Sequence, residues 1–218
     1  MAAGAQSPLA LPAAHLAAPG ASAPRPATPA TLLVLGDSLS AEYGLARGTG
    51  WVALLQARLA REPRAATRAV KVVNASISGD TTSGGRSRLP ALLAQHQPQT
   101  VIIELGGNDA LRGLPLPTTQ ANLAAMTVAV QATGAQVLIV GMAVPPNYGR
   151  QYSEDFTRLF ATVARARKAA LVPFLLAGVA DVQNADKLFQ PDRIHPRAEA
   201  HPRMLDNVWP VLKTLLPR

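Results

Sequence analysis

The chain has 218 residues, 48% of them hydrophobic, which is enough for one domain with a sizeable core. It contains no cysteine, which excludes disulfides, thiolate nucleophiles and cysteine-ligated metals. The formal net charge is +8, but the basic residues are dispersed and no zinc-finger, RRM or basic-zipper pattern accompanies them, so we expect no nucleic-acid partner.

Residues 1–30 differ in composition from the rest of the chain. They are rich in Ala and Pro and show no helical or strand periodicity, which predicts a flexible, partly extended segment. A secretory signal needs a basic start and an uninterrupted apolar stretch. Here Pro12 and His15 interrupt the apolar residues and nothing basic precedes them. A degenerate leader, an extension of the mature protein and a misassigned start all remain open.

From residue 31 onward, apolar runs alternate with amphipathic segments. The runs that predict strands are 31–35, 70–75, 100–105, 136–141 and 171–175. Helices are expected near 51–59, over 85–96, over 121–133, over 153–169 with Ser153 as the cap, and over 198–215 with a break near Pro202. Five strands with intervening helices predict a parallel sheet covered on both faces by right-handed crossovers. We therefore expect one α/β domain over 31–218.

A serine follows the first predicted strand, and an Asp and a His stand near the other end of the chain. Ser38 lies in Gly36-Asp-Ser-Leu-Ser40, and Asp192 precedes His195 by three positions. A serine hydroxyl needs an imidazole to take its proton, and the imidazole needs a carboxylate to fix its tautomer. Residues i and i+3 are neighbours on one helical turn, so the spacing of Asp192 and His195 suits that pairing. Each residue alone is typical of a turn or cap, but together they predict a serine hydrolase.

Small polar residues also follow the second and third predicted strands, over 76–83 and 106–109. Turn formation alone accounts for Gly, Asn and Asp at such places. Acyl transfer, however, needs donors for the oxyanion, and a Gly backbone N–H together with an Asn side-chain amide would supply them. In a parallel sheet these three strand ends share one edge, where ligands bind.

In order and approximate spacing, four blocks resemble those of the SGNH (GDSL) hydrolases. They are Gly36–Ser40, Gly79, Gly106–Asp109 and Asp192–His195. The segments Asn74–Asp80, Arg88–Leu93, Glu104–Asp109 with Leu111–Gly113, and Pro146–Gly149 are similar to the bacterial multifunctional acyl-CoA thioesterase, arylesterase and lysophospholipase branch. The resemblance covers roughly residues 31 to 216. It implies a three-layer, doubly wound, flavodoxin-like fold with strand order 2-1-3-4-5.

Carried over residue by residue, the resemblance implies Ser38 as nucleophile, His195 as base and Asp192 as its orienting carboxylate. It implies an oxyanion hole formed by the Ser38 N–H, Gly79 and Asn108. The expected substrates are esters and thioesters of short to medium acyl chains, cleaved through an acyl-enzyme without cofactor or metal. Substrate-pocket candidates are Asp37, Leu39, Glu42, Asp109, Met142, Pro146, Tyr148 and Ile194. Met142 and Tyr148 either line an acyl pocket or pack within their loop. Two positions depart from the pattern of that branch near the mouth of the expected site: Glu42 stands where it often has Gly, and Gly84-Gly85 replaces bulkier polar residues.

The same residues bear on other scaffolds and functions. An α/β-hydrolase would have Gly-x-Ser-x-Gly in the middle of the chain, whereas Ser40 occupies the last position here and the motif follows the first strand. A carbohydrate O-acetyl esterase is the alternative within the hydrolases, and a non-catalytic lipid- or carbohydrate-binding module is the alternative outside them. We expect structural or solvated roles for His15, His96 and His201.

The expected partners are small acyl substrates, with transient contact to a lipid or membrane surface allowed by the charge. The protein is expected to be a monomer. The resemblance implies a periplasmic or secreted enzyme of lipid metabolism, while the absence of a clear signal leaves a cytoplasmic location open.

Overall fold

The computed structural model describes residues 1–2 and 29–217, so nearly all of the segment predicted to be flexible lies outside the described residues. In the part described, five parallel strands form one sheet in the order β2-β1-β3-β4-β5. The strands are β1 (Thr31–Gly36), β2 (Lys71–Asn74), β3 (Thr100–Glu104), β4 (Gln136–Val140) and β5 (Ala170–Val172). The predicted fold class and strand order are confirmed.

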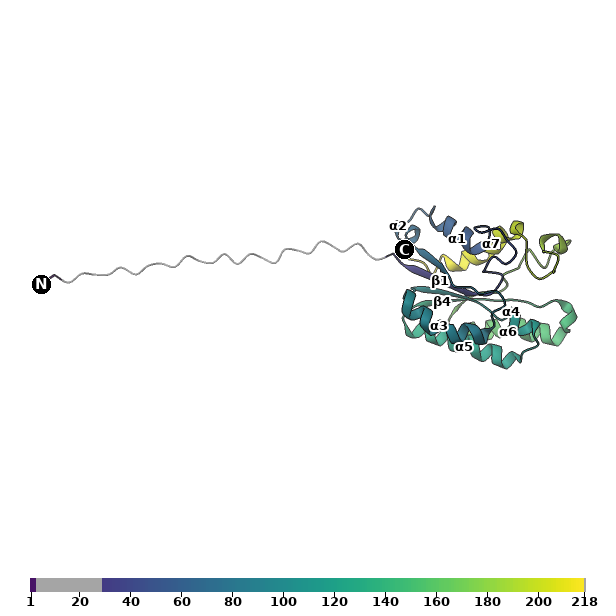
Figure 1. Cartoon of the computed structure of the whole chain (residues 1–218). Helices are drawn as coiled ribbons and strands as arrows, with labels where there is room; N and C mark the ends of the chain where they lie inside the picture. The colour runs from purple at the N-terminus through teal and green to yellow at the C-terminus, as the bar shows by residue number, and fades with distance from the viewer. Residues whose placement is uncertain (3–28, 218) are drawn as a thin grey trace.

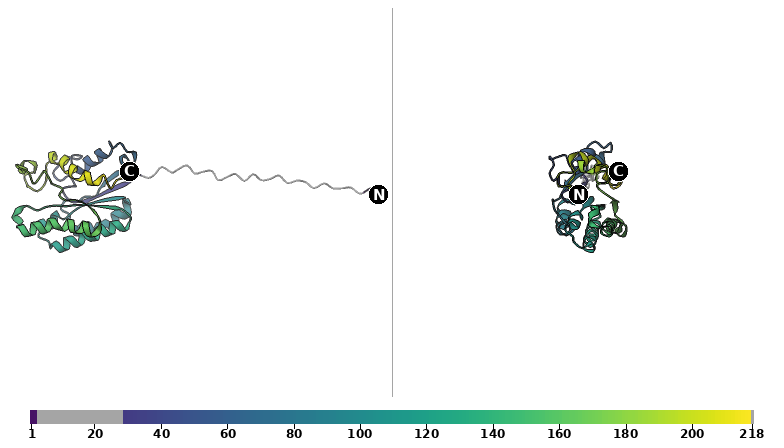
Figure 2. Two further views of the ribbon diagram at one scale, coloured as in Figure 1. Left: turned by 180° about the vertical axis from the view of Figure 1, so that it is seen from behind. Right: turned by 90° about the vertical axis from the view of Figure 1, so that its right-hand side faces the viewer.

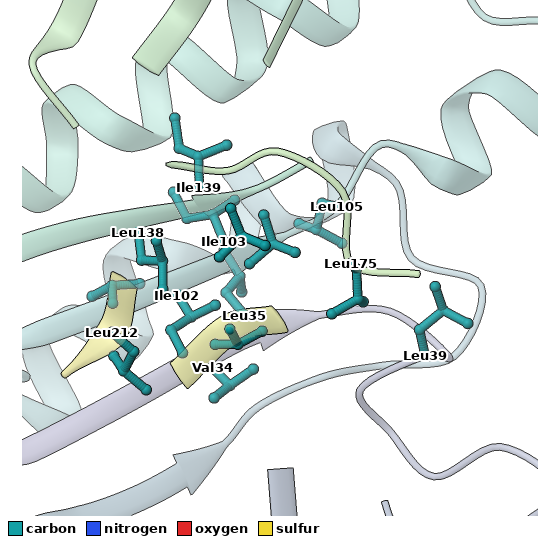
Figure 3. Close-up of a cluster of buried hydrophobic side chains, with 14 of the residues drawn as sticks. Val34, Leu35, Leu39, Ile102, Ile103, Leu105, Leu138, Ile139, Leu175 and Leu212 are labelled. Atoms are coloured by element: carbon teal, nitrogen blue, oxygen red, sulfur yellow. The ribbon is translucent and has the colours of Figure 1, made fainter. Parts of the chain in front are cut away.

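The three central strands are buried on both faces, and their sequences show why. β1, β3 and β4 read as almost continuous apolar runs, as parallel strands do when helices cover both sides. Figure 3 shows side chains of these strands, including Val34, Ile102 and Ile139, packed in one cluster. The edge strands β2 and β5 are shorter and partly exposed.

Helices cover both faces of the sheet (Figures 1 and 2). On one face lie α1 (Trp51–Leu59), α2 (Ala65–Arg68) and α7 (His201–Leu212). On the other lie α3 (Thr82–His96), α5 (Leu116–Ala132) and α6 (Arg150–Arg167), with the short α4 (Gly107–Leu111) directly after β3. Three 3₁₀ turns complete the elements that the structure describes: Pro146–Tyr148, Ala185–Leu188 and Ala198–Ala200. None of the helices described is long and apolar enough to cross a membrane.

Several predicted boundaries differ from the observed ones. Ser153 does not cap α6, because the helix begins three residues earlier, after Gly149, and the Ser153 hydroxyl donates to the Gly149 carbonyl from inside the first turns. α5 starts at Leu116 instead of Ala121, with a proline in its first turn, where a missing N–H costs nothing. The short helices α2 and α4 were not predicted. The break near Pro202 is confirmed as a 3₁₀ turn before α7.

The connections that follow β1, β2 and β3 leave the sheet at the same edge, because the strands are parallel and adjacent. Ser38 follows β1, Gly79 follows β2 and Asn108 lies on α4 after β3. The fold therefore gathers three segments that are far apart in the sequence at the carboxyl ends of neighbouring strands.

Candidate active site

Ser38 lies in a tight turn immediately after β1. The Asp37 carbonyl accepts hydrogen bonds from the N–H groups of Ser40 at 3.2 Å and Ala41 at 2.9 Å. The Asp37 carboxylate accepts the Leu39 N–H at 3.0 Å. Both neighbours of Ser38 are buried, while Ser38 itself is partly exposed. The turn therefore leaves Ser38 accessible to solvent between two buried residues.

The structure brings His195 and Asp192 to this hydroxyl. His195 Nε2 lies 2.8 Å from Ser38 Oγ, and His195 Nδ1 lies 2.7 Å from Asp192 Oδ2. Desolvation raises the pKa of Asp192, but hydrogen bonds from the His195 N–H, the His195 ring and the Ile194 N–H outweigh it and lower this pKa to about 2. An ionised Asp192 can only accept, so Nδ1 of His195 carries the proton and Nε2 is left to accept from Ser38.

The spacing of Asp192 and His195 predicted a helical turn, but the structure shows none there. They belong to a loop in which Arg193 has a φ of +58°. Asp192 Oδ1 accepts the N–H groups of Ile194 at 2.9 Å and His195 at 3.0 Å, which folds the loop around the carboxylate. The side chains meet because Asp192 organises its own turn.

The two other predicted site residues, Gly79 and Asn108, lie at the same sheet edge. Gly79 is the third residue of a turn closed by a hydrogen bond from the Asp80 N–H to the Ile77 carbonyl at 3.1 Å, and its φ of +79° is one that glycine adopts without strain. Asn108 lies near the start of α4, and its Nδ2 donates to Asp37 Oδ2 at 3.1 Å. An amide has two N–H groups, and this contact uses one of them.

A buried carboxyl lies beneath the turn that carries Ser38 and was not predicted. Glu104, the last residue of β3, is fully buried, and its Oε2 accepts the Ser40 hydroxyl at 2.7 Å and the Asp37 N–H at 3.3 Å. The Trp51 indole N–H in turn donates to Ser40 Oγ at 3.2 Å. Desolvation, followed by repulsion from Asp37, raises the pKa of Glu104 well above its ordinary value. Desolvation also raises the pKa of Asp37, to about 6, despite lowering contributions from the Leu39 N–H, the charge of His195 and the Asn108 amide.

The predicted substrate-pocket residues differ in burial, and not all of them can line an open pocket. Asp37 and Leu39 are buried in the turn, and the buried Asp109 carboxylate accepts from the Thr82 and Thr119 hydroxyls, so these three do not line an open pocket. Glu42 has a φ of +59° and its carboxylate accepts the N–H groups of Gly48 and Gly50, which commits it to its own loop. The remaining four candidates differ in exposure: Met142 is buried, Tyr148 is partly buried, Ile194 is 45% exposed, and the Pro146 side chain lies outside what the structure describes.

Two residues near the site were missed. The Tyr43 ring lies 4.3 Å, centroid to centroid, from the His195 ring. The Gln190 amide donates to the Tyr43 carbonyl at 2.9 Å and the Pro196 carbonyl at 3.2 Å, which ties the loop after Ser38 to the loop that carries His195. No local pattern indicates that Gln190 joins these loops, because its contact with Tyr43 spans 147 residues.

Metal ligation has no geometric support among the residues described, which contain no group of three or more His, Cys, Asp or Glu side chains that could hold an ion. A cavity of about 720 Å³ lies elsewhere, lined by Leu93, Pro98, Gly134 and neighbouring residues at the amino ends of the strands. Its lining contains no His, Asp or Glu side chain.

Residues 34–203 match the sequence model of the GDSL-like lipase/acylhydrolase family. The chain is 55% identical over 186 residues to the esterase TesA of Pseudomonas aeruginosa, covering 85% of this chain and 89% of that protein. It is 41% identical over 182 residues to thioesterase 1/protease 1/lysophospholipase L1 of Escherichia coli K12, covering 84% and 83%. A solved TesA structure superposes with a TM-score of 0.80 at 55% identity, covering 85% of this chain and 99% of that one.

Proposed function

The chain belongs to the GDSL-like lipase/acylhydrolase family, and on that premise we propose that it cleaves carboxylic esters and thioesters through an acyl-enzyme formed on Ser38. The observation that carries the proposal is the unbroken chain of contacts from Ser38 Oγ through His195 to Asp192, at 2.8 and 2.7 Å. A hydroxyl, an imidazole and an ionised carboxylate in this order are the arrangement that activates a serine.

In the proposed reaction, Ser38 Oγ forms a bond to the acyl carbon while His195 Nε2 takes the hydroxyl proton. As the tetrahedral intermediate collapses, the bond to the leaving oxygen or sulfur breaks and His195 donates that proton to the leaving group. A water then attacks the acyl carbon, His195 takes its proton, and the Ser38 oxygen leaves with the proton returned. Asp192 stays ionised throughout and holds the ring in the tautomer that each proton transfer requires.

The negative charge on the substrate oxygen is assigned to three donors: the Ser38 N–H, the Gly79 N–H and the side-chain amide of Asn108. They come from the segments after β1, β2 and β3, so each is held by a different part of the sheet edge. Donors fixed before the substrate arrives need no reorganisation when the charge develops. The Asp37 carboxylate restrains the Asn108 amide by accepting one of its N–H groups at 3.1 Å.

The proposed substrates carry short to medium acyl chains. The relatives named an esterase and a thioesterase/lysophospholipase support ester and thioester substrates, and the acyl-chain length is part of the proposal. The test compares p-nitrophenyl acetate, butyrate and octanoate with an acyl-CoA thioester and acetylated xylan. Turnover of the p-nitrophenyl esters or the thioester supports the proposal, and activity confined to acetylated xylan would replace it with a sugar O-acetyl esterase.

A second measurement tests the covalent step. A p-nitrophenyl alkylphosphonate should inactivate the enzyme with release of one p-nitrophenol per chain, and mass spectrometry should locate the phosphonyl group on Ser38. Label on another residue, or inhibition that dialysis reverses, would contradict the acyl-enzyme. The proposed catalytic unit is residues 31–218.

A further inference from the structure

The loop that carries Gly79 is held by a side chain outside the proposed triad and oxyanion hole. Arg88, on the second turn of α3, is half-buried and reaches across to the ends of two strands. Its Nη1 donates to the Ala75 carbonyl, directly after β2, and its Nη2 lies 3.4 Å from the carbonyl of Gly36, the last residue of β1. One guanidinium therefore contacts the segments that lead into both the Gly79 turn and the Ser38 turn.

The same guanidinium forms an ion pair with the residue that follows Gly79. Arg88 Nε donates to Asp80 Oδ2 at 2.8 Å, and Nη2 lies at the same distance from that oxygen. The two side chains are only 21% and 11% exposed, so water screens the pair far less than it would at the surface. The other Asp80 oxygen accepts the Thr81 N–H at 3.0 Å, at the cap of α3.

The Asp80 carboxylate packs closely against Gly84. A Cβ at Gly84 would lie 2.0 Å from Asp80 Oδ1, so a larger residue there would displace the carboxylate. The Gly79 turn is also held from its other side, because the Arg112 guanidinium donates to the Gly79 carbonyl at 2.7 Å. Arg112 is exposed, whereas the contacts of Arg88 and Asp80 are partly buried.

We propose that Arg88 and Asp80 form a clamp that positions the Gly79 N–H for the oxyanion, which makes both of them positioning residues for the hydrolysis reaction. The inference rests on the proposed function, since it presumes that Gly79 is an oxyanion donor. The clamp fixes the Gly79 turn at Ala75 and at Asp80, on either side of the donor. A misplacement of about 1 Å in such a donor can cost a hundredfold in rate, and the loss falls on turnover because the charge exists only in the transition state.

The test measures kcat and KM for p-nitrophenyl butyrate in Arg88→Ala, Arg88→Lys and Asp80→Asn. We expect Arg88→Ala to lower kcat by about tenfold or more with KM changed less than about twofold. Lysine keeps the charge but cannot serve three acceptors in a fork, so Arg88→Lys should recover only part of the loss. Asp80→Asn keeps the shape of the carboxylate and should lower kcat by a smaller factor, which retains a testable variant if Arg88→Ala does not fold.

The matched controls are Arg58→Ala and Asp206→Asn, which remove the same charges from an exposed ion pair at 3.0 Å between α1 and α7. These variants should keep the wild-type kcat. Amide hydrogen exchange over 76–80 should become faster in the Arg88 variants and stay unchanged in the controls.

A lower melting temperature with unchanged kcat would show that the clamp is only structural and would overturn the inference. A raised KM at constant kcat would overturn it as well, because it would assign Arg88 to substrate binding. The variant Asn108→Ala distinguishes failure of the proposed oxyanion hole from failure of the clamp. If it leaves kcat unchanged, the proposed oxyanion hole fails, and if it lowers kcat while Arg88→Ala does not, only the clamp fails.

Discussion

Replacing Asn108 by alanine tests the proposed oxyanion hole most directly. The side chain has two N–H groups, of which one donates to Asp37 Oδ2 at 3.1 Å. The proposed function assigns the other to the substrate oxygen. The substitution removes both and leaves the Ser38–His195–Asp192 contacts in place, so the nucleophile should still be activated.

The expected loss has two parts. Removing one oxyanion donor costs about 10²- to 10³-fold in kcat, or about 2.7–4 kcal/mol of transition-state stabilisation. The buried Asp37 carboxylate also loses a donor, and a hydrogen bond to a charged group contributes about 1.5–3 kcal/mol to folding stability. Because the Asn108 amide lowers the pKa of Asp37, its removal should move that pKa further above its present value of about 6.

The assay is steady-state hydrolysis of p-nitrophenyl butyrate at pH 8, with urea unfolding of the same preparations. The control is Gln131→Ala, which removes an amide that donates to the Arg167 carbonyl and has no contact with the site residues. We expect kcat of Asn108→Ala to fall at least a hundredfold with little change in KM. A kcat within about threefold of wild type, or a raised KM at constant kcat, would refute the reasoning.

Four further predictions follow from the same geometry. Ser38→Ala should abolish nearly all turnover and retain the fold, and residual activity above a few per cent of wild type would reject Ser38 as nucleophile. Burial raises the pKa of Glu104 and so favours the neutral form that glutamine imitates. Glu104→Gln should therefore change the free energy of unfolding at pH 7 by less than about 1 kcal/mol, whereas Glu104→Ala, which leaves the Ser40 hydroxyl and the Asp37 N–H unpaired, should cost about 2–4 kcal/mol in urea titrations. Desolvation lowers the pKa of His201, whose Nδ1 accepts the Trp51 backbone N–H at 2.9 Å. The stabilising effect of His201 should therefore be complete above about pH 6.5 and be lost as the pH falls toward the lowered pKa. Urea unfolding of wild type and His201→Asn between pH 5 and 8 checks this, and equal pH dependence in both would contradict it. Deletion of residues 1–28, which include none of the proposed site residues, should leave kcat/KM for p-nitrophenyl butyrate within about twofold of the full chain.

Most of the fold follows from patterns that are local in the sequence. Apolar runs such as 100–105 and 136–141 mark the central strands because parallel strands buried on both faces need no polar positions. The proposed nucleophile and donors are also indicated locally, since small polar residues follow each of three adjacent strands. The helix that begins at Leu116 was placed five residues late, because its first turn lacks a side-chain cap and carries Pro117.

The loop around His195 was wrongly interpreted, although the sequence contained the relevant signal. Pro196 follows His195 directly, and a residue before proline is disfavoured in the α conformation. Pro191 disfavours the same conformation at Gln190, just before the Asp192 loop. A turn built on the Asp192 carboxylate would have been the better prediction from these two prolines, and it gives the same pairing of Asp192 with His195.

The support beneath the site could not be predicted, because its contacts join residues that are distant in the sequence. Glu104 meets Ser40 and Asp37 across 64 and 67 positions, and a lone Glu at a strand end carries no local sign of that role. Gly36 has a reason of the same kind: a Cβ there would lie 2.8 Å from both Glu104 Oε2 and Ser40 Cβ. The glycine that opens the Gly36–Ser40 segment is thus required by the buried Glu104 carboxyl and the Ser40 side chain, and not by a left-handed backbone. In the segment 36–40, the proposal assigns only Ser38 to the chemistry. Asp37 and Ser40 hydrogen-bond to Glu104, and Asp37 also accepts from Asn108, while Gly36 leaves room for the Glu104 carboxyl.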